Sequence, residues 1–307
     1  MTTSSRATTV GRYTLLSKVG EGGMGVVHLA EYPPGHHVAI KLLRPHVVSD
    51  DHGRARMARE VTSLRRVRSP RVAEVYDADP WGETPYIVTR FVPGPSLQDR
   101  VGAWGPLQGA ELESFARGLA QALAAVHAAG VLHRDIKPSN VLLDGSGPVL
   151  IDFGLAQLCD DARITYSGWL LGTPGYLAPE ILYGEDPTPQ ADVHSWAATV
   201  VYAATGRGPY GTGPAIAVMD RVRRGEHDLA GVPDALYWLV RQCLSPDPHD
   251  RPSSGQVADW LSGGGRAAPD ATATAVPQAR RAAPSAARPL QPTARSGATQ
   301  VSPAPAT

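Results

Sequence analysis

The sequence predicts an α+β protein with two lobes: a β-rich first lobe with one main helix and a mostly α second lobe. Two features of the 307 residues lead to this prediction. Up to residue 92, short apolar runs rich in β-branched residues are separated by glycine and proline turns, which is typical of strands. From residue 93 to about 261, apolar residues recur with helical spacing over longer stretches. A chain of this length can bury a core in each lobe.

In the first lobe, residues 13–92, a change of period marks the main helix. Over residues 54–68 the apolar side chains Met57, Val61 and Leu64 fall on one helical face. The expected strands around this helix are 13–19, 26–30, 37–43, 72–76 and 86–91.

The second lobe, residues 93–261, begins after the turn Pro93-Gly94-Pro95. Its expected helices are 112–129, 191–205, 215–224, 235–243 and 255–261. Both ends of the chain, 1–12 and 262–307, lack the apolar residues needed to offset the entropy of ordering. We therefore expect a disordered N-terminus and a disordered tail rich in Ala, Pro and Arg.

Composition excludes several classes of protein. Lys+Arg and Asp+Glu both number 29, so no overall positive charge indicates nucleic-acid binding. Cys159 and Cys243 lack the spacing of a zinc site or a disulfide framework, which suits a reducing compartment. Residues 1–10 lack the apolar core of a secretory signal, and the most apolar stretch, 119–132, is too short for a membrane span. We expect a cytoplasmic protein with no membrane span and no nucleic-acid partner.

A glycine-rich turn follows the first expected strand. Gly20, Gly22 and Gly25 fit GxGxxG, a pattern shared by dinucleotide-binding turns, ordinary hairpins and phosphate-binding turns. A dinucleotide-binding turn requires a helix next, but residues 26–30 are strand-like. No Gly-Lys-Ser/Thr follows, which excludes a Walker A loop. What remains is a hairpin whose backbone N–H groups can approach phosphates closely, because glycine has no Cβ.

Residue types that are rare in this chain gather in motif-like stretches. Asn140 is its one asparagine, and Lys41 and Lys137 lie in such stretches whereas the third lysine, Lys18, does not. In a chain with 26 arginines, lysine is expected to persist where a compact ammonium group is hard to replace. Residue usage therefore points to a site for phosphate and metal.

Five motifs occur in order between residues 13 and 261. They are Gly20-x-Gly22-x-x-Gly25-x-Val27, Val38-Ala-Ile-Lys41, His133-Arg-Asp-Ile-Lys-Pro-Ser-Asn140, Asp152-Phe-Gly154 and Ala178-Pro-Glu180. In this register the chain resembles the Hanks-type (eukaryotic-like) serine/threonine protein kinases that are widespread in bacteria. The resemblance implies the bilobal protein kinase fold and transfer of the ATP γ-phosphate to Ser/Thr hydroxyls of protein substrates.

The resemblance assigns catalytic roles to four residues. Asp135 would accept the proton of the substrate hydroxyl, and Lys137 would steady the γ-phosphate. Lys41 would bind the α- and β-phosphates, tethered by Glu60 from the first-lobe helix. Lys137 two residues after Asp135, together with Thr173, matches the Ser/Thr pattern rather than the tyrosine-specific one.

The implied cofactors are ATP and Mg²⁺, although the same oxygen ligands also accept Mn²⁺. Asn140 and Asp152 would hold the metal. The expected nucleotide-binding residues match the family's positions around the nucleotide: Val19, Gly20, Gly22, Gly25, Val27, Ala39, Lys41 and Leu142.

Other positions are expected to support the site. Glu180 should form a buried ion pair with Arg251, and Asp192 should anchor the backbone of the catalytic loop. Two positions depart from the family pattern. Thr89 is smaller than the usual methionine, which makes a back pocket reachable, and Arg90 replaces an acidic residue of the hinge.

Regulation is expected to act through phosphorylation. Thr165 and Ser167 match positions where related bacterial kinases phosphorylate themselves, and Arg134 is the expected partner of such a phosphate. The resemblance also implies two kinds of partner: a homodimer through the first lobe, and phosphothreonine-binding modules recruited by the activation loop or the tail.

Two other functions fit parts of the sequence. A nucleotide-binding pseudokinase that acts as a scaffold would have the same fold, but Lys41, Asp135 and Asp152 are all present. A small-molecule phosphotransferase shares the Asp-x4-Asn loop, yet generally lacks a peptide-positioning segment such as 172–180. An active protein kinase is therefore the favoured interpretation.

Overall fold

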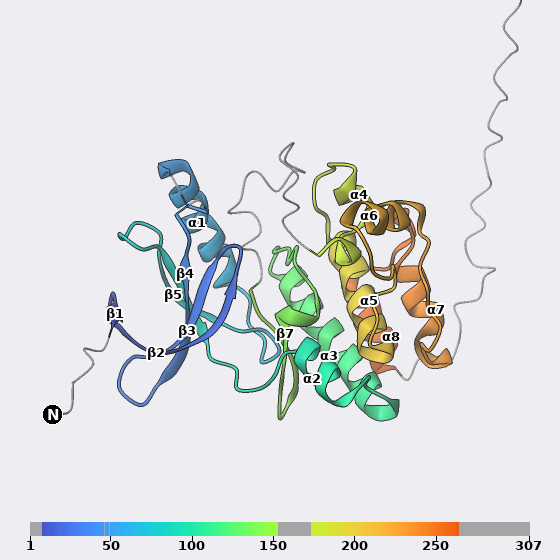
Figure 1. Ribbon diagram of the computed structural model, residues 1–307, viewed down its shortest axis with the longest axis horizontal. Coiled ribbons are helices and arrows are strands. Elements are labelled where there is room, and N and C mark those ends of the chain that lie inside the picture. The colour runs from blue at the N-terminus through green and yellow to red at the C-terminus, as the bar shows by residue number, and fades with distance from the viewer. Residues whose placement is uncertain (1–7, 46, 49, 153–172, 264–307) are drawn as a thin grey trace, which may run out of the picture. The chain divides into compact units, whose positions relative to one another are not determined.

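A computed structural model describes residues 8–45, 47–48, 50–152 and 173–263 of the chain (Figure 1). All of these residues lie within one unit, Met1–Arg266. Phe153 and Gly154 of the fourth motif, Thr165 and Ser167, and the tail beyond residue 263 fall outside the described residues.

The first lobe is built on an antiparallel sheet of six strands in the order β1-β2-β3-β4-β6-β5. The strands are β1 Thr9–Val10, β2 Tyr13–Gly22, β3 Gly25–Glu31, β4 His37–Leu43, β5 Val75–Asp79 and β6 Tyr86–Arg90. Strand β5 begins at Val75 rather than at residue 72, because Val72 instead forms a bridge with Leu150 in the second lobe. The other four predicted strands are confirmed at their predicted places.

Alternation along β4 separates the two faces of this sheet. Val38 and Ile40 are buried in the apolar cluster on one face. Ala39 and Lys41 point to the opposite face, since successive side chains of a strand alternate. Lys41 pairs with Val27 of β3, so Val27 shares that second face. The sheet thereby presents Val27, Ala39 and Lys41 together.

Helix α1, Asp51–Leu64, is the main helix of the first lobe. It begins three residues before the predicted range 54–68, because the Asp50 side chain accepts a hydrogen bond from the N–H of Gly53 at 2.8 Å and caps the helix. Met57, Val61 and Leu64 are all buried, as their shared face predicted.

The fold begins earlier than the sequence predicts. Residues 1–12 were expected to be disordered, but Thr9–Val10 forms β1 and pairs with β2. The turn between the strands uses Gly11 at φ +55°, a conformation that favours glycine, and Arg12 donates to Asp77 at 2.7 Å. A strand of two residues has no period to detect, which explains the error.

The second lobe is mostly helical (Figure 1). The five predicted helices are confirmed, whereas α2 and the hairpin of β7 and β8 were missed because such short elements carry little periodicity. Within the described ranges, no helix combines the length and the apolar character needed to cross a bilayer. The elements are α2 Leu97–Trp104, α3 Gly109–Ala128, β7 Val141–Asp144, β8 Gly147–Leu150, α4 Pro179–Leu182, α5 Pro189–Thr205, α6 Ala215–Arg224, α7 Asp234–Cys243 and α8 Ser254–Ser262.

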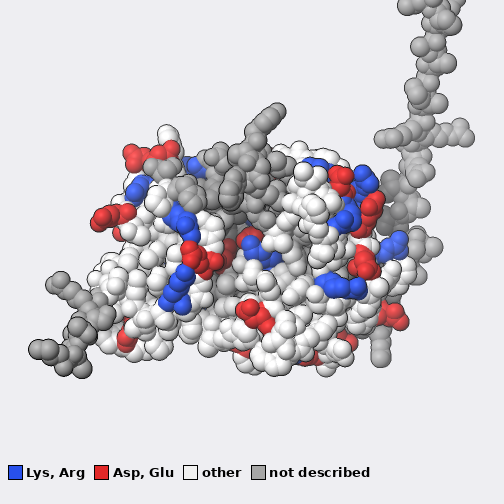
Figure 2. All heavy atoms as spheres, viewed as in Figure 1, with Lys and Arg blue, Asp and Glu red and all other residues white. Residues whose placement is uncertain are grey.

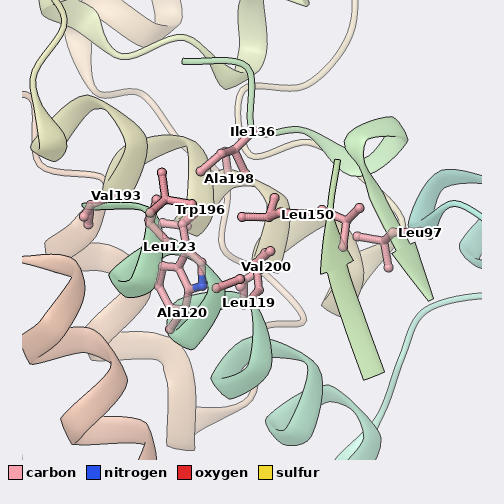
Figure 3. Close-up of a cluster of buried hydrophobic side chains, with 14 of the residues drawn as sticks. Leu97, Leu119, Ala120, Leu123, Ile136, Leu150, Val193, Trp196, Ala198 and Val200 are labelled. Carbon is pink, nitrogen blue, oxygen red and sulfur yellow. The ribbon is translucent and has the colours of Figure 1, made fainter. Parts of the chain in front are cut away.

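Helix α5 lies at the centre of the second lobe's core. Figure 3 shows Trp196 and Val200 of α5 close to Leu119, Ala120 and Leu123 of α3. The Trp196 side chain is fully buried, and its indole N–H donates to a backbone carbonyl of α3 at 3.3 Å. A helix buried on nearly all sides must be apolar or give its polar groups partners. The buried polar side chains of α5, such as Asp192, therefore need hydrogen-bond partners in the core.

A buried ion pair joins α4 to the chain before α8. Arg251 donates to both carboxylate oxygens of Glu180, at 2.7 and 2.8 Å, and each residue is only 4 % exposed. Arg251 also donates to the carbonyl oxygens of Ser245 at 2.8 Å and Gln190 at 3.0 Å. The predicted pair is therefore confirmed, with its remaining donors satisfied.

We expect the change Arg251→Met to lower the free energy of unfolding by about 3–5 kcal/mol, because it leaves the Glu180 carboxylate buried without a partner. Urea denaturation of the purified chain measures this loss. Adding Glu180→Gln should recover part of it, because the buried charge is then gone. If Arg251→Met alone were as stable as the unaltered chain, the importance of the buried pair would be contradicted.

His194 of α5 is a buried titratable group. Its ring stacks on that of Tyr210 with centroids 5.7 Å apart, and Nε2 lies 2.8 Å from the Tyr210 hydroxyl. Burial, followed by the nearby Arg251 and His227, holds the pKa of His194 well below its usual value of 6.5. The folded protein therefore keeps this ring neutral at pH values where the unfolded chain protonates it.

This difference predicts loss of stability in acid. The unfolded chain binds the extra proton below pH 6.5, so the contribution of His194 is complete above that pH and falls as the pH drops. The fall should approach about 1.4 kcal/mol per pH unit for this ring. His194→Gln, which keeps a hydrogen-bonding side chain beside the Tyr210 hydroxyl, should flatten the dependence by that amount in urea denaturation at a series of pH values. His36, whose ring is exposed, gives the control His36→Gln. An equal pH dependence of the free energy of unfolding in the unaltered chain and both variants would contradict the prediction.

Candidate active site

A cleft of about 1190 Å³ is lined by residues of both lobes. Figure 2 shows acidic and basic side chains meeting in the hollow between the lobes, while the rest of this face mixes both signs. All the predicted nucleotide-binding residues line the cleft, as do Asp135, Lys137, Asn140 and Asp152. Glu60 is the one predicted site residue that does not.

The glycine-rich turn between β2 and β3 forms one wall of the cleft. Gly25 is required by packing, because a Cβ there would lie 2.1 Å from the carbonyl oxygen of Leu42. A Cβ at Gly22 would have no other atom within 4 Å, and one at Gly20 would lie 3.9 Å from its nearest neighbour. Packing therefore does not account for these two glycines, and the open space beside them would allow a ligand to approach the backbone.

Apolar side chains from the two lobes line the cleft. Val27 and Ala39 come from β3 and β4, and Leu142 comes from β7 in the second lobe. Thr89 of β6 pairs with Ala39 and also lines the cleft. Arg90, the departure at the hinge, donates to the carbonyl oxygen of Pro70 at 2.8 Å. Aliphatic side chains contributed by both lobes suit a planar aromatic ring.

The catalytic loop is fastened through its backbone to Asp192 of α5. The carboxylate of Asp192 accepts the backbone N–H groups of His133 and Arg134, each at 2.7 Å. Arg134 has φ +67°, which is costly for a residue with a side chain. The prediction that Asp192 anchors this loop is confirmed, and the anchor holds a strained backbone in place.

His133 connects the loop to the segment that carries Asp152. Its Nδ1 accepts the backbone N–H of Asp135 at 3.3 Å, and its Nε2 lies 3.1 Å from the carbonyl oxygen of Ile151. This pairing requires the proton on Nε2. Full burial lowers the pKa of His133, which favours the neutral ring. His133 is thus a buried residue that supports the loop.

The carboxylate of Asp135 lies at the cleft in a fixed orientation. The Lys137 ammonium donates to its two oxygens at 2.9 and 2.8 Å. The side-chain N–H₂ of Asn140 donates to Asp135 twice, to the backbone oxygen and to Oδ2, both at 2.8 Å. Three residues that the sequence groups in one motif therefore form one hydrogen-bonded cluster.

Lys41 and Asp152 meet across the cleft. The Lys41 ammonium is 2.8 Å from Oδ2 of Asp152, which joins β4 of the first lobe to the second lobe. Asp152 has φ +60°, again unfavourable for a residue with a side chain. Such strain gathers at functional sites, where the surrounding structure maintains it.

Glu60 stands apart from this cluster. Among the described residues no ion pair joins it to Lys41, whose ammonium contacts Asp152 instead. Burial raises the pKa of Glu60, and the positive charges of Arg134 and Arg59 act against that rise. The predicted tether is therefore not formed in this structure, because Lys41 already has a carboxylate partner and Glu60 has other cations nearby.

Two contributors were not predicted. His127 of α3 has Nε2 2.9 Å from the Asp192 carboxylate and Nδ1 2.8 Å from the hydroxyl of Ser254, the first residue of α8. The only sequence signal was a histidine within the apolar stretch 119–132. That signal cannot reveal partners that lie 65 and 127 residues away in the chain.

Comparison with known proteins agrees with this geometry. A family model described as "Protein kinase domain" matches residues 13–260. The probable serine/threonine-protein kinase PkwA of Thermomonospora curvata is 41 % identical over 253 residues, covering 82 % of this chain and 34 % of PkwA. The serine/threonine-protein kinase AfsK of Streptomyces griseus is 41 % identical over 240 residues, covering 78 % of this chain and 30 % of AfsK. The chain thus spans about a third of the length of these relatives.

A solved structure shows the same fold. The kinase domain of PknI from Mycobacterium tuberculosis has a TM-score of 0.66 and 28 % identity, covering 84 % of this chain and 98 % of that domain. Because the domain match spans most of the sequence and bacterial relatives reach 41 % identity, the chain belongs to the protein kinase family, among the bacterial Hanks-type serine/threonine kinases.

Proposed function

We propose that the chain is an ATP-dependent protein kinase that transfers the γ-phosphate to serine and threonine hydroxyls of proteins, itself included. The arrangement around Asp135 carries the proposal, because its carboxylate faces the cleft with both oxygens held by Lys137. Membership of the family implies the use of ATP and a divalent metal ion. Since transfer is mainly a matter of positioning, a fixed carboxylate beside the cleft is the part that the protein must supply.

Asp135 is proposed to aim the substrate hydroxyl and accept its proton. As the hydroxyl oxygen bonds to the γ-phosphorus, the bond to the bridging oxygen breaks and ADP leaves. The hydrogen bonds from Lys137 and Asn140 keep the carboxylate from turning away. Lys137 would also face the transferred phosphoryl group, whose negative charge its ammonium can stabilise.

The residues of the cleft fit a divalent cation, and Mg²⁺ is our proposal. Asn140 uses both of its amide hydrogens on Asp135, so Oδ1 is its remaining atom for a metal. In Asp152, Lys41 engages Oδ2, which leaves Oδ1. Mg²⁺ prefers such oxygen ligands, together with phosphate oxygens of the nucleotide. When bound, the ion would offset the charge of the phosphates.

Lys41 and Glu60 are proposed to complete the site when nucleotide binds. Phosphate oxygens would engage the Lys41 ammonium, which now contacts Asp152. Arg134 lies near enough to Glu60 to influence its pKa. A phosphate carried by Thr165 or Ser167 would attract Arg134 and free Glu60 to approach Lys41. The pair of Lys41 and Glu60 would then form in the phosphorylated chain with nucleotide bound.

Intact-mass spectrometry of chain incubated with ATP and Mg²⁺ tests the proposal. Protein that was first dephosphorylated should gain phosphate, and peptide mapping should place it on Thr165 or Ser167. The variant Asp135→Asn should lose at least about 100-fold in rate, because general-base and positioning roles contribute that much.

The same experiment separates the alternative functions. If the chain binds ATP but adds phosphate neither to itself nor to a general protein acceptor, the pseudokinase scaffold would be favoured. Equal phosphate on the Asp135→Asn variant would instead reveal a contaminating kinase and leave Asp135 without its proposed role. Repeating the reaction with Mn²⁺ in place of Mg²⁺ shows which ion the oxygen ligands prefer.

A further inference from the structure

The glycine-rich turn contains one acidic residue, Glu21, and that residue lines the cleft. Its backbone pairs with Val26 across the turn, between the two glycines that packing does not require. If this turn covers the phosphates of a nucleotide, a free carboxylate here would repel them. The turn must therefore keep the Glu21 carboxylate occupied.

Two cations hold the Glu21 carboxylate. Arg44 Nη2 lies 2.5 Å from one oxygen, and the Lys18 ammonium forms an ion pair with the other. Lys18 belongs to β2, whereas Arg44 follows the end of β4. Neither cation is among the residues that line the cleft, while Glu21 is. The two cations that engage the carboxylate thus lie outside the lining of the cleft.

Arg44 is attached to the turn at a second point. Its backbone N–H donates to the carbonyl oxygen of Met24 at 2.9 Å. Gly25, which follows Met24, packs against the carbonyl oxygen of Leu42 so closely that no Cβ would fit. Both halves of the turn therefore contact the chain around the end of β4. Arg44, which makes the hydrogen bond and the ion pair, lies three residues beyond Lys41.

We propose that Arg44, together with Lys18, is a positioning residue for nucleotide binding: it holds the Glu21 carboxylate away from the phosphates and fixes the turn relative to Lys41. The side chains of the three residues are 42–52 % exposed, and exposed ion pairs contribute little to folding stability. The contribution should therefore show in binding of phosphates rather than in the stability of the fold. This role goes beyond phosphate transfer, and its test rests on the proposed function only in that the chain must bind ATP.

Isothermal titration calorimetry with AMP-PNP and Mg²⁺, beside adenosine, tests the role. Arg44→Gln should weaken AMP-PNP about fivefold, because the Glu21 carboxylate then keeps only Lys18 and is less firmly held away from the phosphates. Adenosine, which has no phosphate, should bind within about twofold of the unaltered chain. The loss should shrink in about 0.5 M salt, where exposed charges are screened.

Combining substitutions separates a held carboxylate from a simple effect of net charge. Glu21→Gln alone should bind AMP-PNP within about twofold of the unaltered chain, because its charge is already held, and Glu21→Gln with Arg44→Gln should recover normal binding. Additive effects, in which Glu21→Gln strengthens binding as much as Arg44→Gln weakens it, would overturn the inference. So would equal weakening of adenosine and AMP-PNP.

The pair of Arg100 in α2 and Glu111 in α3, 3.1 Å apart, provides the matched control. Arg100→Gln should leave both ligands unaffected, and thermal unfolding should show all variants folded. Identical AMP-PNP binding by every variant would overturn this inference while leaving the kinase proposal intact. Failure of the unaltered chain to bind AMP-PNP would overturn both.

Discussion

The backbone of the catalytic loop depends on one buried carboxylate. Asp192, 1 % exposed, accepts the N–H groups of His133 and Arg134 and so holds a backbone turn that would otherwise be unfavourable. Asp135, Lys137 and Asn140 all follow this turn within a few residues, and their mutual hydrogen bonds require the turn to keep its shape. A buried carboxylate is costly unless its oxygens are satisfied, so the core around α5 and the geometry of the loop support each other.

The two lobes divide the work of the cleft. The first lobe supplies a sheet whose alternation displays Ala39 and Lys41, together with a turn that a ligand can approach. The second lobe supplies fixed oxygen and nitrogen atoms on a loop held by buried polar contacts. The Lys41–Asp152 pair joins the two sets of residues.

Much of this structure could be predicted from the sequence, and the exceptions share a physical cause. Long periodic segments such as α3 and α5, and the motif residues of the cleft, were predicted because each pattern is local in sequence. The two-residue β1, the eight-residue α2 and the β7–β8 hairpin were missed, because they are too short to show a period. The Glu60–Lys41 pair is not formed in this structure for a different reason. A motif fixes which residues exist, whereas the competing charges of Asp152 and Arg134 decide which of them pair.

The contact of His127 with Ser254 has a consequence for where the domain can end. Ser254 is the first residue of the last described helix, and through His127 it reaches the carboxylate that holds the catalytic loop. The α8 helix also packs along α3, where Arg117 donates to the carbonyl oxygen of Leu261 at 3.0 Å. A chain cut before α8 would keep every motif residue of the cleft and still lose a support of the loop. The support of this loop therefore extends to α8, beyond the last motif in the sequence.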